Sequence, residues 1–235
     1  KLILNLEALL LSMAIPTLLI LIWLKPKFTN FKSNYKQLLK ENKVFGRPVY
    51  LGVIAGVASA QIAGFSLSYF VDNINVGFFA LAITATTPLA MLPVAFGTTL
   101  FKDFISLPRI PANIVVYTFL LGIASLAVFM LLIGTLIDFL YPSEFGPVTN
   151  LCYYCAIGST LHGFGDFINR FLYAKGKGRV LRNSNYILGI INVGGYIGLV
   201  FLWGINGVAI TKLLAGIAYM LNMLIVYLAI VKEKN

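Results

Sequence analysis

The stretch from His162 to Asn185, HGFGDFINRFLYAKGKGRVLRNSN, begins as an apolar helix and ends as a basic loop. It carries the only histidine of the chain, His162, followed by Asp166 and Arg170 before the basic loop begins. Ionisable groups inside a hydrocarbon layer are costly, so these side chains need protein partners or water. The alternation of apolar runs and basic loops, of which this stretch is one instance, predicts the fold.

The composition of the chain is that of an integral membrane protein. Its 235 residues are 59% hydrophobic and only 11% charged, and the mean hydropathy is +0.89. A soluble domain needs more polar surface to cover its core. The net charge of +10 does not indicate nucleic-acid binding, because the basic residues lie between apolar spans. Two cysteines, Cys152 and Cys155, are too few for a disulfide framework.

Seven apolar runs are long enough to cross about 30 Å of hydrocarbon at about 1.5 Å per residue. The fifth run is less apolar than the others, and the sixth is short. The sequence therefore predicts an all-α fold, a polytopic membrane helix bundle with seven transmembrane helices. The predicted spans are 2–24, 49–70, 76–101, 113–137, 148–171, 185–202 and 207–230.

The loops between these spans alternate in charge. Lysine and arginine occur in 25–48, 102–112, 172–184 and the C-terminal tail, whereas 71–75, 138–147 and 203–206 contain neither. Because cytoplasmic loops are enriched in basic residues, this asymmetry predicts that the basic loops and the C-terminus are cytoplasmic. Contact with lipid headgroups is the simplest role for the basic loops, and substrate binding is the alternative.

The predicted fifth helix carries a polar stripe. His162, Asp166 and Arg170 lie at i, i+4 and i+8, and Asn169 shares their face. We expect Asp166 and Arg170 to pair, and His162 to hydrogen-bond as a neutral imidazole. Two interpretations stay open: a structural stripe that locks helices together, or the wall of a water-accessible cavity with a proton-coupling group.

Three other kinds of site are excluded. Cys152, Cys155, His162 and Asp166 are zinc-type ligands, but all four lie on one helix, and the two turns from Cys155 to His162 are too long for one tetrahedral ion. The same spacing excludes a Cys–His–Asp hydrolase. The glycines and lysines near residue 176 follow a membrane helix and not a strand, so the phosphate-loop pattern is absent.

Other spans carry features that favour helix packing or motion. The second span has a small residue at every fourth position, which permits static close packing or sliding against a neighbour. That series is Gly52, Gly56, Ala60, Gly64 and Ser68. Pro88 and Pro93 predict a kinked third span, in which nearby threonines satisfy the freed carbonyls. The glycine-rich sixth span is either closely packed or broken. Lys212 either extends to the outer headgroups or faces a cavity.

Three segments resemble a known family. They are VFGRPVYLG at 44–52, VDNINVGFFALAITATTPLAMLP at 71–93 and RFLYAKGKGRVLRNSN at 170–185. In order and spacing the chain resembles the C-terminal half of the polysaccharide (O-antigen, lipid-linked oligosaccharide) flippases of the multidrug/oligosaccharidyl-lipid/polysaccharide exporter superfamily. It departs from the family at Phe78 and Phe79, where Gly-Tyr-type pairs are common.

The resemblance implies an architecture and a function. It implies a twelve-helix, V-shaped transporter of two six-helix lobes. Residues 1–24 would be the last transmembrane helix of the N-terminal lobe, 25–48 the basic cytoplasmic linker, and 49–235 the C-terminal transport lobe. We therefore expect the chain to be a piece of a longer protein in the bacterial cytoplasmic membrane. The implied activity is the transfer of a polyprenyl-diphosphate-linked oligosaccharide from the inner to the outer leaflet by alternating access.

The resemblance also implies that the second and third spans line the central cleft. The first group of candidate cavity residues is Gln61, Ser66, Tyr69, Asp72, Asn73 and Thr84. The second group is His162, Asp166 and Arg170, and a basic cytoplasmic mouth comprises Lys175, Lys177, Arg179 and Arg182. The expected partners are the lipid-linked oligosaccharide, membrane lipids, a coupling ion (H⁺ or Na⁺), the first lobe and the polysaccharide polymerase machinery.

Rival functions make different demands on the sequence. An ion-coupled multidrug or cation antiporter of the same superfamily needs acidic residues in the cleft, where only Asp72 and Asp166 are candidates. A membrane glycosyl- or acyltransferase needs clustered catalytic groups near a membrane face, usually with long outer loops. A structural subunit needs none of these features. We therefore expect a transporter and not an enzyme, without a cofactor or a bound metal ion.

Overall fold

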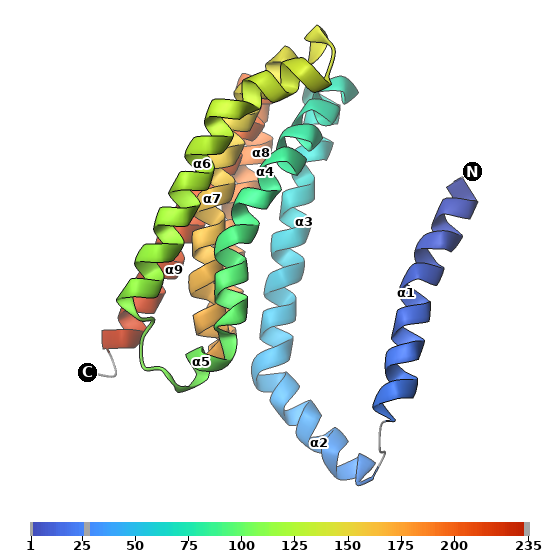
Figure 1. Cartoon of the computed structure of the whole chain (residues 1–235), viewed down its shortest axis with the longest axis vertical. Coiled ribbons are helices and arrows are strands. Elements are labelled where there is room, and N and C mark those ends of the chain that lie inside the picture. The colour runs from blue at the N-terminus through green and yellow to red at the C-terminus, as the bar shows by residue number, and fades with distance from the viewer. Residues whose placement is uncertain (1, 26–28, 233–235) are drawn as a thin grey trace. The chain divides into compact units, whose positions relative to one another are not determined.

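The computed structural model describes residues 2–25 and 29–232. The chain divides into two compact units between Glu41 and Asn42. Lys1, residues 26–28 of the predicted linker and residues 233–235 of the predicted cytoplasmic C-terminus lie outside the described residues. Helices make up almost all of the described chain (Figure 1). The all-α fold class is therefore confirmed.

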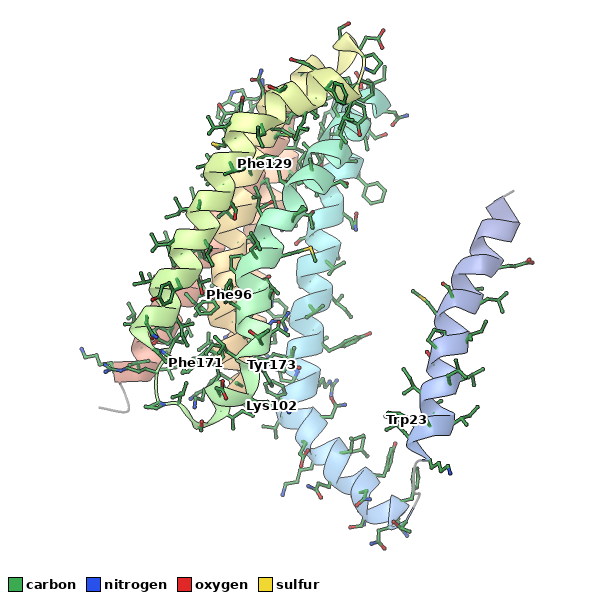
Figure 2. The ribbon with its side chains drawn as sticks, viewed as in Figure 1. Trp23, Phe96, Lys102, Phe129, Phe171 and Tyr173 are labelled. Carbon is green, nitrogen blue, oxygen red and sulfur yellow. The ribbon has the colours of Figure 1, made fainter. Side chains whose placement is uncertain are left out.

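The first unit contains two helices. Helix α1 (Leu2–Leu24) is apolar and remains helical through Pro16, and its Trp23 side chain is exposed (Figure 2). Helix α2 (Phe31–Glu41) lies within the predicted linker, where the sequence analysis expected a loop. It is amphipathic, with Lys32, Lys36 and Lys40 at i, i+4 and i+8. The linker therefore contains an ordered helix that hydropathy alone does not predict.

The second unit is a bundle of long helices joined by short connections (Figure 1). A π-helical turn, η1 (Asn42–Gly46), leads into α3 (Arg47–Phe70), which has Pro48 in its first turn. The remaining elements are α4 (Asn73–Thr99), α5 (Phe101–Ser106), α6 (Ala112–Leu140), η2 (Ser143–Phe145), α7 (Gly146–Ala174), α8 (Gly178–Trp203) and α9 (Ile205–Lys232).

Each of the seven predicted spans corresponds in position to one long helix. Among the described residues, five helices are long and apolar enough to cross a membrane: Phe31–Phe70, which contains α3, and α4, α6, α8 and α9. By length and composition, these five fit a helical membrane bundle. The apolar part described for α1 is shorter, at Leu10–Leu24, and α7 is too polar to meet the same criterion. The count of seven spans stays a prediction.

The predicted start of the sixth span is wrong. We expected a basic loop over 172–184 and a short span from residue 185, but α7 continues to Ala174 and α8 already begins at Gly178. Only residues 175–177 connect them, and Gly176 adopts a positive φ of 68° in that turn. Arg179 and Arg182 are therefore helical, and α8 is a continuous helix instead of a short or broken one.

The two prolines of α4 do not interrupt the helix, which is continuous over Asn73–Thr99. The hydroxyls of Thr84 and Thr87 donate to the carbonyls of Ala80 and Ile83, at 2.8 and 2.7 Å. Pro88 frees the carbonyl of Thr84, four residues before it. The expectation that threonines satisfy the freed carbonyls is therefore wrong for these two hydroxyls, which bond within the turn that precedes the proline.

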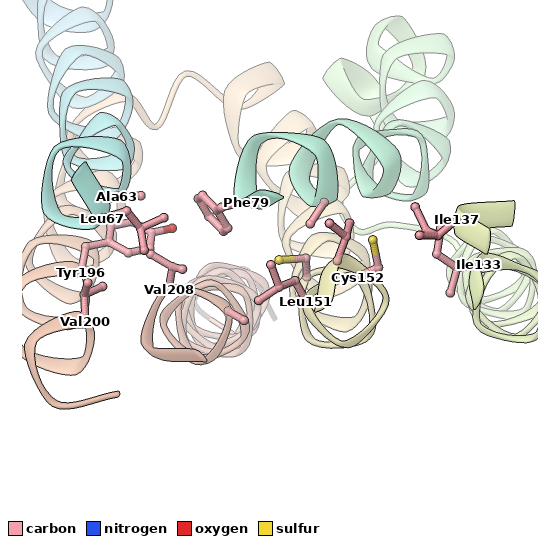
Figure 3. Close-up of a cluster of buried hydrophobic side chains, with 14 residues drawn as sticks. Ala63, Leu67, Phe79, Ile133, Ile137, Leu151, Cys152, Tyr196, Val200 and Val208 are labelled. Atoms are coloured by element: carbon pink, nitrogen blue, oxygen red, sulfur yellow. The ribbon is translucent and has the colours of Figure 1, made fainter. Parts of the chain in front are cut away.

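Helix α7 lies at the centre of the bundle. It packs along α4 and α9, while α8 packs along α3 and α9, so that α3 and α4 meet only sparsely. One apolar cluster joins Leu67 of α3, Phe79 of α4, Leu151 of α7, Tyr196 of α8 and Val208 of α9 (Figure 3). A second apolar cluster surrounds Phe104, Phe167 and Phe171. Because protein covers α7 on most sides, this helix can carry polar residues.

Glycines let the backbones around α7 approach one another closely. A Cβ atom at Gly158 would lie 2.6 Å from the carbonyl oxygen of Lys212 in α9. A Cβ atom at Gly163 would lie 2.7 Å from the carbonyl oxygen of Ala90 in α4. When a glycine lies where two helices cross, the backbones come closer and gain van der Waals contact along their length. The positions of α4 and α9 against α7 therefore depend on these glycines.

We predict that Gly158→Ala destabilises the bundle by about 1–3 kcal/mol, because the new methyl group meets backbone atoms that cannot move independently. The gain in helix propensity, roughly 1 kcal/mol, works in the opposite direction. Thermal unfolding in detergent measures the change. Gly64→Ala is the matched control, since no atom lies within 4 Å of a Cβ atom there. Equal melting temperatures for the two variants would contradict the proposed packing.

Candidate functional site

A polar cavity of about 400 Å³ lies inside the second unit, between α3, α7, α8 and α9. Helix α3 contributes small and apolar residues to it, including Val53, Gly56 and Ala60. The other three helices contribute the polar groups. These are His162, Asp166, Asn169, Arg170 and Tyr173 from α7, Asn185, Asn192 and Tyr196 from α8, and Lys212 and Tyr219 from α9.

The polar stripe predicted on α7 forms one wall of this cavity. His162, Asp166 and Arg170 all line it, as does Asn169. The opposite face of α7 carries Phe167 and Phe171, which are buried in the second apolar cluster. About a third of the Asp166 side chain stays exposed. The stripe therefore borders an accessible space, as the cavity-wall interpretation requires.

The hydroxyl of Tyr219 is the centre of the hydrogen-bond network. It donates to Oδ1 of Asp166 at 2.9 Å and accepts from Nδ2 of Asn169 at 2.7 Å. The imidazole of His162 stacks on the Tyr219 ring, with centroids 4.4 Å apart and planes inclined by 19°. His162 Nε2 lies 3.8 Å from Asp166 Oδ2. Tyr219 therefore fixes three side chains of α7 from the neighbouring helix.

The expected ion pair between Asp166 and Arg170 does not form within the described residues. Asp166 bonds to Tyr219 instead, because the phenol of α9 reaches it directly. The aliphatic stem of Arg170 rests on the bare backbone of Gly97 in α4, where a Cβ atom would lie 2.9 Å from Arg170 Cγ. This contact holds Arg170 at the cavity while its charge stays uncompensated by Asp166.

Two further polar groups lie in the cavity wall. Lys212 lines the cavity, so the cavity-facing interpretation of this lysine is supported over the extended one. Asn192 donates to Oγ of Ser59 at 3.2 Å, while its own carbonyl oxygen is buried without a partner. Two cations, Arg170 and Lys212, face one carboxylate, Asp166. The cavity lining thus has a formal excess of positive charge, which suits an anionic ligand.

The first group of candidate residues lies outside this cavity. Gln61, Tyr69, Asp72, Asn73 and Thr84 are exposed on α3 and α4, and Ser66 is buried away from it. Their hydrogen bonds are local, as shown by Ser68 Oγ donating to Asn73 Oδ1 at 2.7 Å. The structure therefore does not bring the two candidate groups together, and a cleft-lining role for the first stays a prediction.

The residues of the predicted basic mouth make separate contacts at the turn between α7 and α8, and their role as a mouth stays a prediction. Lys175 donates to the carbonyl of Ile105 at 2.9 Å and lies over the Phe171 ring. Arg182 lies over the Tyr186 ring, 5.8 Å from its centroid, and Arg179 is exposed. None of the four residues, Lys177 included, lines the cavity. Arg170 is the one charged residue between 170 and 182 that does.

Residues that the sequence analysis did not select complete the site. They are Tyr173 of α7, Asn185, Asn192 and Tyr196 of α8, and Tyr219 of α9. A signal for them exists in the spacing of polar residues. Three pairs of polar residues have a spacing of seven: His162 with Asn169, Asn185 with Asn192, and Lys212 with Tyr219. Seven residues are two helical turns, so three successive helices each present two polar side chains on one face.

No family model, no curated protein and no solved structure matches the chain.

Asp72 has a structural role at the start of α4. Its Oδ1 accepts from the backbone N–H of Asn75 at 2.7 Å, and both oxygens accept from the Asn75 amide. The backbone N–H of Asn75 is the main reason why the pKa of Asp72 lies below its usual value. A carboxylate at this position also complements the helix dipole.

We predict that Asp72→Ala lowers the melting temperature and that Asp72→Asn lowers it less, because asparagine also caps helices. A depressed pKa in the folded state stabilises the protein above the unfolded value of about 3.9. The difference between the wild type and Asp72→Asn should therefore persist at neutral pH and disappear as the pH falls below about 4. Melting curves at several pH values test this, and a pH-independent difference would contradict it.

We predict that Tyr219→Phe destabilises the protein by about 1–3 kcal/mol, because Asp166 and Asn169 both lose their partner inside the bundle. Thermal unfolding in detergent measures the loss. Tyr154→Phe removes a phenol from an exposed position on α7 and serves as the matched control, with little expected change. An equal effect of the two substitutions would show that the Tyr219 hydroxyl does not hold the site together.

Proposed function

We propose that the chain is the C-terminal transport lobe of a flippase. The flippase would move a polyprenyl-diphosphate-linked oligosaccharide across the bacterial cytoplasmic membrane by alternating access. The observation that carries the proposal is the cavity with excess positive charge between α3, α7, α8 and α9. A lipid-linked sugar has a diphosphate and many hydroxyls, so its passage through an apolar layer requires cations, donors and acceptors. The resemblance of the segments 44–52, 71–93 and 170–185 supports the same conclusion.

The polar groups of the cavity have suitable chemistry for the two parts of such a headgroup. Arg170 and Lys212 supply charge for the diphosphate. Asn185, Asn192 and Tyr173 supply the amides and the phenol that sugar hydroxyls bind. A volume of about 400 Å³ is within the usual range for small-molecule sites, so the cavity suits the diphosphate and the sugar nearest to it. In the implied V-shaped protein, the first lobe would contact the rest of the oligosaccharide.

A second candidate function is an ion-coupled multidrug or cation antiporter of the same superfamily. One observation favours it: the carboxylate of Asp166 borders the cavity and lies beside His162. A cationic drug would be attracted by Asp166 but repelled by Arg170 and Lys212. The excess of positive charge therefore favours the flippase.

We predict that Arg170→Ala in the full-length protein reduces transport about tenfold or more, since charge-assisted hydrogen bonds contribute about 1.5–3 kcal/mol. The gene is deleted and complemented with the wild type, with Arg170→Ala or with Arg109→Ala at matched expression. Arg109 is exposed in the connection between α5 and α6 and controls for a general loss of positive charge. Mass spectrometry measures the lipid-linked oligosaccharide and its accessibility from each leaflet.

The outcomes separate the candidate functions. The flippase is supported if finished repeat units stay on the cytoplasmic side in the deletion strain and in the Arg170→Ala strain. The Arg109→Ala strain should not accumulate them. Shortened or missing repeat units would indicate a transferase. Normal glycolipid together with altered drug sensitivity would indicate the antiporter. Unchanged export by Arg170→Ala would remove this residue from the substrate path.

A further inference from the structure

An apolar groove of about 750 Å³ lies on another face of the α3–α8 pair. Its α3 side is formed by Ala55, Ala58, Ser59 and Ile62, which are spaced at i, i+3, i+4 and i+7. Its α8 side is formed by Tyr186, Gly189, Ile190, Val193 and Gly194, with the corresponding spacing. One face of each helix therefore contributes to a single groove, with the buried Ser59 and Gly189 at its floor and the exposed Tyr186 and Ile190 at its rim.

The groove offers no free hydrogen-bonding group at its floor. Ser59 is its one hydroxyl-bearing floor residue, and this hydroxyl donates to the carbonyl of Gly56 at 2.8 Å. It also accepts from Asn192 of α8 at 3.2 Å. Both bonds are made within the protein, so that the floor of the groove presents hydrocarbon alone. Its occupant must therefore also be hydrocarbon along this length.

A cation lies in line with one end of the groove. One row on the surface of α8 has a residue at every fourth position: Arg182, Tyr186, Ile190 and Gly194. The guanidinium of Arg182 lies 5.8 Å from the centroid of the Tyr186 ring. Its Nε and one terminal nitrogen donate to Oδ1 of Asn183, at 3.2 and 3.0 Å, and no carboxylate pairs with Arg182 in the described part of the chain. From Arg182 to Gly194 the row extends about 18 Å, close to the depth of one hydrocarbon leaflet, about 15 Å.

We propose that this groove binds one phospholipid with an anionic headgroup. The acyl chain lies between α3 and α8, and the phosphate group is held by Arg182. The row from Arg182 to the far end of the groove is about as long as one leaflet is deep, so a phosphate at Arg182 would place an acyl chain along the groove. A transmembrane helix of another protein would fill the groove but would not use the cation at the end of the row, which has no carboxylate partner in the described part of the chain.

The bound lipid is distinct from the proposed substrate. Val53, Gly56, Val57 and Ala60 face the cavity from α3, whereas Ala55, Ala58, Ser59 and Ile62 face the groove. The cavity and the groove thus lie on different faces of the same helix pair. A lipid in the groove supports the wall of the cavity and does not depend on the proposed transport activity.

Gly194 makes the proposal directly testable. No atom lies within 4 Å of a Cβ atom at Gly194 or at Gly198, one turn further along α8. Gly194 lines the groove and Gly198 does not. The Gly194→Leu side chain should therefore fill the groove without disturbing the fold. The Gly198→Leu side chain should leave the groove open to a lipid. Equal melting temperatures of the two variants in detergent would show that a difference in lipid binding between them does not come from a difference in stability.

Native mass spectrometry of the purified full-length protein measures the binding. The probes are phosphatidylglycerol and phosphatidylcholine with identical acyl chains. We expect the wild type and Gly198→Leu to retain one phosphatidylglycerol in preference to phosphatidylcholine. Gly194→Leu should weaken that binding by about tenfold or more. Arg182→Gln should remove the preference for phosphatidylglycerol while leaving chain binding in place.

Equal binding of phosphatidylglycerol by Gly194→Leu and Gly198→Leu would overturn the proposal, as would equal binding of the two lipids by the wild type. A second measurement covers the case in which Gly194→Leu does not fold. Phosphatidylglycerol with a photoreactive group in mid-chain should label peptides that contain residues 55–62 and 186–194 of the wild type. Labelling confined to other helices would exclude the groove as the site.

Discussion

Polar groups that lie among apolar helices must find their partners within the protein, because hydrocarbon offers them none. In this chain the requirement is met around Tyr219, whose single hydroxyl accepts from Asn169 and donates to Asp166. The ring of the same residue supports His162. With Asp166 engaged in this way, the positive charge of Arg170 is left for the cavity. The electrostatic character of the cavity thus depends on a bond made between two helices, α7 and α9.

Helices α3 and α8 form a wall with a different environment on each of its two sides. On one side the wall borders the polar cavity, and on the other it forms the apolar groove. The hydrogen bond from Asn192 to Ser59 connects the two sides through the wall. Anything that separates α3 from α8 must therefore break a buried hydrogen bond and open the groove at the same time.

The sequence predicts the helices well and the partners of the polar stripe poorly, for physical reasons. Apolar runs must cover a fixed thickness of hydrocarbon, so six of the long helices lie within a few residues of their expected positions. The start of α8 is missed because Arg179, Arg182 and Asn183 read as a loop, although polar residues suit a helix at headgroup depth. Tyr219 and Asn192 lie on other helices than His162. The one sequence signal of a shared surface is that each of these residues has a polar partner seven residues away on its own helix. The pairing of Asp166 with Tyr219 instead of Arg170 depends on how α9 packs, which no local pattern encodes.

The contact between α3 and α8 also constrains how the protein is made. Ser59 and Asn192 are separated by 133 residues. At a synthesis rate of about 5–20 residues per second, α3 leaves the ribosome roughly 7–27 s before its partner does. During that time α3 must stay in the bilayer without the helix against which it finally packs. The valine, isoleucine and alanine residues of α3 must therefore first keep the helix stable in lipid. They pack against α8 only later. Biogenesis and the finished structure thus place separate demands on the same residues.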